Sequence, residues 1–81
     1  MTYAVDWDQT ALDDASGHLD DTVGLQVVMD GADTLADDPR PDGTLAMGSG
    51  RYRLRVGRYR VYYDVDDHAM TVTVIRCGRA T

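Results

Sequence analysis

Toward its C-terminal end the sequence alternates apolar and polar residues with a period of two, and this pattern constrains the fold more than any other feature. Residues 51–56 and 59–65 both alternate in this way, and Gly57-Arg58 between them places glycine first in a two-residue turn. Successive side chains of a strand point to opposite faces of a sheet, and a turn of this kind is typical of a type II′ hairpin. A polar turn at 66–69 and a β-rich run at 70–76 follow. Together these residues predict a three-stranded meander.

The N-terminal residues predict a short strand followed by a helix. Residues 3–7 alternate, which places Tyr3, Val5 and Trp7 on one face. Asp8 stands where a helix N-cap is favoured, so we expect a helix over residues 9–19. Its expected apolar stripe consists of Leu12, Ala15 and Leu19, which recur at helical spacing.

A second helix is expected to begin after Asp20 or Asp21 and to form an antiparallel hairpin with the first. Its apolar stripe is Leu25, Val28, Ala32 and Leu35, broadened by Met29 and Ala36. Pro39 and Pro41 end the helix, and the glycine-rich residues 44–50 are expected to form a loop. The order β-α-α-β-β-β predicts one α+β domain over residues 1–81, in which a helical hairpin packs on an antiparallel sheet. One face of that sheet remains uncovered.

Charge is distributed very unevenly along the chain. Residues 1–50 contain eleven aspartates and one arginine, whereas residues 51–81 contain seven arginines and three aspartates. The net charge of −6 therefore divides into a strongly acidic half and a basic half. A polyanion responds to the charge within a Debye length, ~8–10 Å, so the overall negative charge does not exclude a nucleic-acid partner.

Secreted and membrane-spanning classes are not expected. The first 25 residues contain six aspartates and no basic start, which argues against a signal peptide, and no run approaches the ~20 apolar residues that span a bilayer. Cys77 is the single cysteine and cannot form an internal disulfide, and we interpret it as a packed apolar residue. We therefore expect a cytoplasmic protein.

Strand alternation gathers arginines on one face. If the apolar side chains of residues 51–65 face the helices, Arg53, Arg55 and Arg60 lie together on the uncovered face with Tyr62. One interpretation is a phosphate-binding patch with an aromatic ring available for base stacking. The other is a set of ordinary solvated arginines, paired with aspartates of the acidic half. The direction of Arg76 remains ambiguous, because it is in phase with the valines near the end of its strand.

Several segments resemble the RelE/ParE superfamily of toxins from bacterial type II toxin–antitoxin systems. Residues 48–67 (GSGRYRLRVGRYRVYYDVDD) resemble the central strands of these toxins, with a basic strand, a tight turn and a Tyr-Arg-aliphatic strand. Residues 71–79 (TVTVIRCGR) resemble the final strand and the Gly-His/Lys-Arg that follows it. Residues 3–12 (YAVDWDQTAL) and 35–43 (LADDPRPDG) also match, so the resemblance spans nearly the whole chain.

The resemblance implies an endoribonuclease that cleaves mRNA on the ribosome without a metal or a small-molecule cofactor, and that is inhibited by a cognate antitoxin. The 2′-hydroxyl of the RNA would attack the adjacent phosphate, which requires a base, an acid and stabilisation of the phosphorane charge. By position Arg60 would stabilise that charge, Arg53 and Arg55 would bind the backbone, and Arg79 would substitute for a terminal catalytic arginine. Further RNA contacts are expected from Arg51, Arg58, Tyr62 and Arg76. No metal site is expected at His18 or His68.

Two departures keep other functions open. Ala80 occupies the position of the family's terminal arginine, and the printed sequence has no C-terminal tyrosine like that of RelE-type enzymes. A ParE-like toxin that inhibits DNA gyrase would need neither residue. A third possibility is a catalytically inert member whose role is antitoxin binding.

Overall fold

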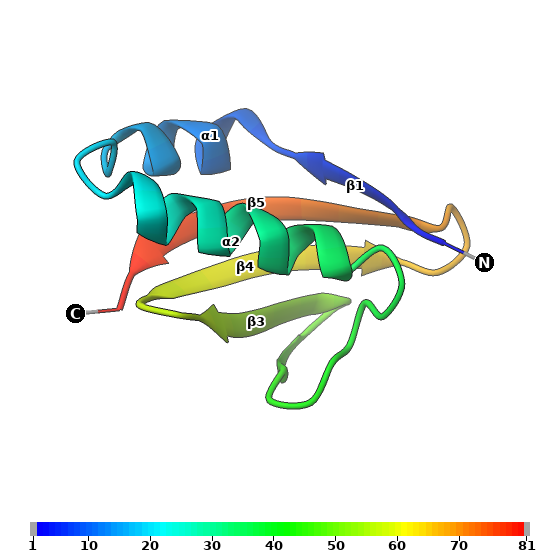
Figure 1. Cartoon of the computed structure of the whole chain (residues 1–81). Helices are drawn as coiled ribbons and strands as arrows, with labels where there is room; N and C mark the ends of the chain where they lie inside the picture. The colour runs from blue at the N-terminus through cyan, green and yellow to red at the C-terminus, as the bar shows by residue number, and fades with distance from the viewer. Residues whose placement is uncertain (1, 81) are drawn as a thin grey trace.

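The computed structural model describes residues 2–80 as two helices on one side of a five-stranded sheet (Figure 1). The helices are α1 (Gln9–Ser16) and α2 (Thr22–Thr34). The strands are β1 (Ala4–Trp7), β2 (Leu45–Gly48), β3 (Arg51–Val56), β4 (Tyr59–Asp66) and β5 (Thr71–Arg79). They lie in the order β1-β5-β4-β3-β2. The predicted α+β class, with a helical hairpin packed on a sheet, is confirmed.

The sheet differs from the prediction at both edges. Residues 45–48, expected in a loop, form the edge strand β2, which pairs antiparallel with β3. All four β2 residues are exposed, so the strand has no buried face and leaves no alternating pattern in the sequence. At the other edge β1 runs parallel to β5, so the sheet is mixed and not antiparallel throughout.

The first helix begins as predicted but packs differently. The Asp8 carboxylate accepts a hydrogen bond from the Thr10 N–H at 3.1 Å, which caps α1. The predicted stripe stays outside the core, because Ala11 is the buried residue of α1, while Leu12 and Leu19 are 45% and 66% exposed. On the side of α1 that contacts β5, Asp14 also accepts a hydrogen bond from the Cys77 N–H at 3.0 Å. The face that α1 presents to β5 therefore carries Ala11 and Asp14.

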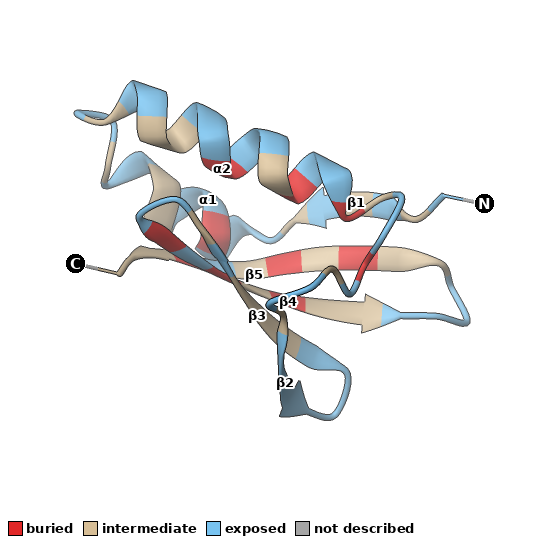
Figure 2. Ribbon diagram, turned by 60° about the horizontal axis from the view of Figure 1, so that its bottom comes forward, coloured by how far each residue is buried: buried red, intermediate tan, exposed pale blue. Residues whose placement is uncertain are grey.

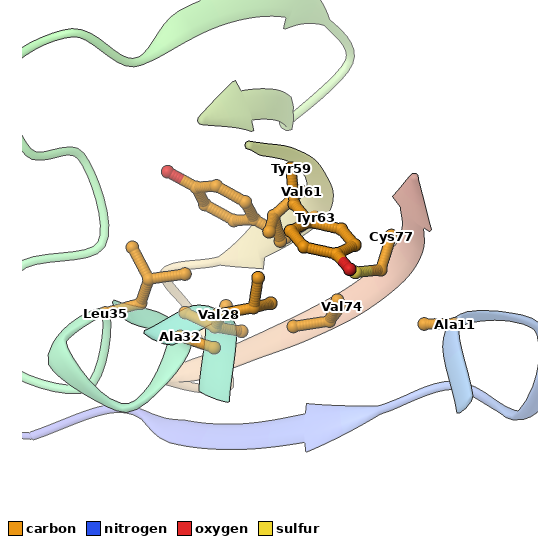
Figure 3. Packing of buried hydrophobic residues seen from close by; sticks show 10 residues of the cluster. Ala11, Val28, Ala32, Leu35, Tyr59, Val61, Tyr63, Val74 and Cys77 are labelled. Carbon is orange, nitrogen blue, oxygen red and sulfur yellow. The ribbon is translucent and has the colours of Figure 1, made fainter. Parts of the chain in front are cut away.

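The second helix packs its predicted stripe onto the sheet. Asp21 caps α2 by accepting a hydrogen bond from the Gly24 N–H at 3.0 Å. Val28, Ala32 and Leu35 are buried, and Figure 3 shows them facing the side chains of β4 and β5. Leu25 packs at the margin of this core. Met29, predicted to broaden this stripe, is 52% exposed and lies outside the core.

The helix-facing side of the sheet forms the rest of the core. Its fully buried side chains are Tyr59, Val61 and Tyr63 of β4 and Val72, Val74 and Cys77 of β5. Buried segments of the sheet are red in Figure 2, and Figure 3 labels all of these side chains except Val72. Cys77 is fully buried within this core, which confirms its prediction as a packed apolar residue. Burial also raises the pKa of its thiol. Because one face of the central strands is buried in this way, the alternate side chains must lie on the uncovered face.

Candidate nucleic-acid interface

The β3–β4 hairpin builds the uncovered face. Gly57 has φ +59°, as the first position of a type II′ turn requires, and Val56 pairs with Tyr59 across the two-residue connection. This turn fixes the register, so that Arg55 stands opposite Arg60. The next row on the same face pairs Arg53 with Tyr62, and Tyr62 in turn pairs with Arg76 of β5. The structure therefore brings the three predicted arginines together beside the tyrosine.

These three arginines have no carboxylate partner among residues 2–80. Arg55 Nε donates a long hydrogen bond, 3.4 Å, to the Gly57 carbonyl oxygen. Neither Arg53 nor Arg60 takes part in a side-chain hydrogen bond or ion pair within the described residues. Arg60 is exposed and Arg53 is half-buried. We name Arg53, Arg55 and Arg60 the open-face cluster. No ion pair within the described residues neutralises its positive charge.

A fourth arginine on this face is neutralised. Arg51 donates two hydrogen bonds to Asp64, at 2.7 and 3.0 Å. The carboxylate raises the pKa of Arg51 and fixes its guanidinium against the sheet. Arg51 therefore contributes less free charge to the face than the sequence suggested.

A β-bulge resolves the ambiguous direction of Arg76. Tyr62 pairs with Arg76 and Tyr63 pairs with Val74, so Ile75 is an extra residue on β5 and the alternation shifts by one. Arg76 thereby joins the row of Tyr62, but its guanidinium bends to α1 and donates to Asp14 at 2.8 and 3.2 Å. The same contact, with the hydrogen bond from the Cys77 N–H, lowers the pKa of Asp14.

Arg79 lies on the helix-facing side of the sheet. It pairs with the buried Tyr59, and its Nη2 donates a hydrogen bond to the Tyr59 hydroxyl at 3.1 Å. Tyr59 donates to Asp21 at 2.9 Å, and the Arg79 guanidinium is 3.7 Å from carboxylate oxygens of Asp20 and Asp21. The structure therefore does not bring Arg79 to Arg60, and its contacts join the end of β5 to the start of α2. Arg58 is exposed in the hairpin turn, beside the open-face cluster in sequence.

Sequence reasoning missed a groove between the two helices. It has a volume of about 290 Å³ and is lined by apolar side chains except for Ser16; the others are Trp7, Leu12, Ala15, Leu19, Leu25, Val28 and Met29. The signal was present, because the stripe predicted for the first helix supplies much of this lining. The sequence predicted the stripe but not the surface that it faces, which is an open groove.

Neither helix in the described part of the chain is long and apolar enough to cross a membrane. Within residues 2–80 no three or more histidine, cysteine or acidic side chains are grouped as metal ligands would be.

Two helices on one side of a five-stranded sheet form a fold of the RelE type. The mycobacterial RelBE2 toxin–antitoxin complex (Mycobacterium tuberculosis) contains a chain of this kind, with 26% identity, a TM-score of 0.81, and coverage of 98% of this chain and 99% of that one. A chain of the intact Escherichia coli RelBE complex matches with 29% identity and a TM-score of 0.70, covering 98% of each chain. A mutant of E. coli RelE bound to the antitoxin peptide RelBc is 32% identical with a TM-score of 0.69, covering 100% of this chain and 86% of that one.

The family model described as "ParE toxin of type II toxin-antitoxin system, parDE" matches residues 5–81. This chain belongs to that toxin family, within the RelE/ParE superfamily. Among proteins with curated functions, none matches its sequence.

Proposed function

We propose that this toxin cleaves mRNA on the ribosome, by the open-face cluster and without a metal. One observation carries the proposal. Four arginines of the described chain, Arg40, Arg51, Arg76 and Arg79, form ion pairs with aspartates, whereas the open-face cluster has no such partner. Like charges on neighbouring strands repel, so the fold gains nothing from this cluster unless an anion lies on it.

The cluster is suited to stabilising the negative charge that develops on the phosphate when the neighbouring 2′-hydroxyl of the RNA attacks it. In that reaction the 2′-hydroxyl gives its proton to a base and its oxygen bonds to the phosphorus. The bond from phosphorus to the 5′ oxygen then breaks, and that oxygen takes a proton. Arginine stays protonated at neutral pH, so Arg53, Arg55 and Arg60 bind and stabilise the phosphorane and do not act as the base. Tyr62, beside Arg53, offers a ring for a base to stack on.

Induced expression in bacteria followed by mapping of RNA 5′ ends tests the proposal. We expect discrete cleavages within translated messages, and a loss on the order of 100-fold in Arg60→Ala, the size of effect seen when one charge-stabilising donor is removed. Arg40→Gln is the matched control, because it removes the same charge from a residue that is bonded to Asp67 and Tyr52, outside the cluster. If Arg60→Ala cleaves as well as the unmodified toxin, the proposed role of the cluster is wrong.

A gyrase-directed toxin is the second candidate, and the match to the ParE family model is the observation that favours it. Such a toxin would use the arginine face, or another surface, to bind a protein and would leave RNA intact. Gyrase arrest with double-strand DNA breaks and unchanged RNA ends would therefore support this candidate over the first. Growth without either effect would indicate an inert member of the family.

We also propose that a cognate antitoxin occupies the groove between α1 and α2 with a basic, amphipathic segment. The relatives with similar structures include toxin–antitoxin complexes. The groove is apolar, and exposed apolar grooves of this kind indicate a binding surface. Residues 9–34, which form its walls, contain six aspartates and neither arginine nor lysine. Charge complementarity therefore calls for arginines or lysines along the margins of the partner segment.

Co-purification with the product of an adjacent small reading frame tests this surface. We expect Leu19→Ser with Met29→Ser to weaken the complex at least tenfold, since both side chains line the groove and both are exposed. Val23→Ser is the control, because Val23 is 77% exposed on α2 without lining the groove. If the double variant binds the antitoxin as tightly as Val23→Ser does, the antitoxin does not bind in this groove.

A further inference from the structure

Next to Arg60, strand β5 contributes no side chain to the uncovered face. Gly78 pairs directly with Arg60, which in turn pairs with Arg55, so the three residues form one row across the sheet. Cys77, the preceding residue, is buried on the helix-facing side. Position 78 therefore faces the same side as Arg60.

Within residues 2–80 the space above Gly78 is open. A Cβ placed there would have no heavy atom of these residues within 4 Å, apart from those of its chain neighbours. The side chain of Arg60 itself therefore does not lie across this position. Gly31 shows the opposite case, since a Cβ there would be 2.8 Å from Val56 Cγ1.

Neither backbone geometry nor packing requires glycine at position 78. Its φ lies outside the left-handed region, in contrast to the φ of Gly57, so any residue can adopt its conformation. Glycine in a strand lowers β propensity and adds no packing, and such a glycine often marks the close approach of a ligand. Gly78 therefore weakens the strand, and neither its backbone conformation nor its packing compensates for this.

We propose that the ribose–phosphate backbone of RNA lies over Gly78 and from there reaches Arg60 and Arg55. This inference rests on the proposed RNA-cleaving function and adds a contact site to it. Side chains of directly opposed residues stand about 4.5–5.5 Å apart at Cβ, so any side chain at position 78 would fill the flank of Arg60. A phosphate must come within about 2.7–2.9 Å of guanidinium nitrogens to form charge-assisted hydrogen bonds. The bare strand at Gly78 gives it that access, because the other flank of Arg60 is occupied by Arg55.

Gly78→Ala and Gly78→Leu in the full chain test the proposal. The probes are a fluorescein-labelled single-stranded RNA oligonucleotide for binding and RNA end mapping for cleavage. We expect both variants to fold with an unchanged or higher Tm. Binding and cleavage should fall about threefold in Gly78→Ala and at least tenfold in Gly78→Leu, following the volume added. Thr73→Leu is the control, because Thr73 lies on the same face of β5 in the row of Asp64, away from Arg60.

The outcomes separate this inference from the proposed function. If the unmodified toxin binds and cleaves RNA and Gly78→Leu does so equally well, the inference is wrong and the proposed function stands. If the unmodified toxin does neither, both are wrong. If Gly78→Leu does not fold, the space is not open as described, and the inference also fails. Equal losses in Thr73→Leu would contradict it as well, because bulk anywhere on the strand would then suffice.

Discussion

Arg55 and Arg60 stand directly opposite each other on β3 and β4, and no carboxylate among residues 2–80 bonds to either. Two guanidinium groups in this position repel each other, and sheets usually avoid like charges in directly opposed positions. On the same two strands Arg51 is opposite Asp64 and forms two hydrogen bonds with it. On one face of this hairpin, the pair Arg55–Arg60 is therefore repulsive, whereas the pair Arg51–Asp64 is attractive.

This contrast predicts that a substitution at position 55 can raise stability while it lowers activity. Arg55→Thr removes the repulsion and introduces a residue with high β propensity, so the free energy of unfolding should rise by roughly 0.2–1 kcal/mol. RNA cleavage should fall at least tenfold. Urea denaturation and RNA end mapping measure the two effects. Arg51→Thr is the comparison: it removes an attractive contact and should not raise stability, and a rise of equal size there would show that β propensity alone explains the gain.

Strand alternation predicted the faces of β3 and β4 correctly because hydrophobic burial is strictly periodic along a regular strand. Tyr59, Val61 and Tyr63 had to face the helices, and this placed Arg60 on the other side. The gathering of the open-face cluster was therefore predictable from the sequence before any coordinates.

The parts that sequence could not predict depend on contacts between distant segments. The bulge at Ile75 turns Arg76 out of the valine phase and Arg79 onto the helix-facing side, and no local pattern marks a bulge in so uniform a strand. Similarly, the face that α1 presents to β5 includes Asp14, which accepts a hydrogen bond from a backbone N–H 63 residues away. A helical stripe alone does not show whether it meets a sheet or lines a groove.

Gly31 gives a test of packing against propensity. From sequence this glycine only weakens α2, and alanine should add about 1 kcal/mol to the helix. In the structure a Cβ at position 31 would be 2.8 Å from Val56 Cγ1, so α2 would have to move away from β3. We expect Gly31→Ala to lower the free energy of unfolding by about 1 kcal/mol or more, because overpacking outweighs the gain in helix propensity. Gly17→Ala is the comparison, and an increase in stability for Gly31→Ala would contradict the close approach.

Asp14 predicts a loss of stability in acid. Its hydrogen bond from Arg76 lowers its pKa below the ordinary value of 3.8 in the folded state, whereas the unfolded chain retains the ordinary pKa. A carboxyl group with a lowered folded pKa stabilises the fold above its unfolded pKa and loses that contribution as pH falls through the folded one. Asp21 and Asp67 also have lowered pKa values, through hydrogen bonds from Tyr59 and Arg40 respectively.

The free energy of unfolding should therefore fall between about pH 5 and pH 2, which denaturant titrations at several pH values measure. Asp14→Asn keeps an oxygen that can accept from the Cys77 N–H but has no charge for Arg76. Its stability should be lower than that of the unmodified protein at pH 7, and the difference should shrink toward pH 2. A difference that is constant across this range would show that the charge of Asp14 does not contribute.

At Asp64 we expect a substitution to strengthen RNA binding, in contrast to the substitutions in the arginine cluster, which weaken it. Asp64 lies on the uncovered face, and its two hydrogen bonds hold the guanidinium of Arg51. Asp64→Asn removes one negative charge from the face and releases Arg51 to a phosphate. The dissociation constant for single-stranded RNA should fall about fivefold, the equivalent of roughly 1 kcal/mol for an exposed ion pair. The slope of log K against log salt should become steeper by about 0.7, as expected for one additional phosphate contact.

The double variant Arg51→Gln with Asp64→Asn separates these two contributions. If the released Arg51 causes the gain, the double variant should return to the salt slope of the unmodified toxin, because no additional phosphate contact remains. If the gain persists with Arg51 replaced, removal of the carboxylate alone accounts for it. No gain in Asp64→Asn would mean that RNA does not lie on this face, since a polyanion there must respond to the loss of a neighbouring negative charge.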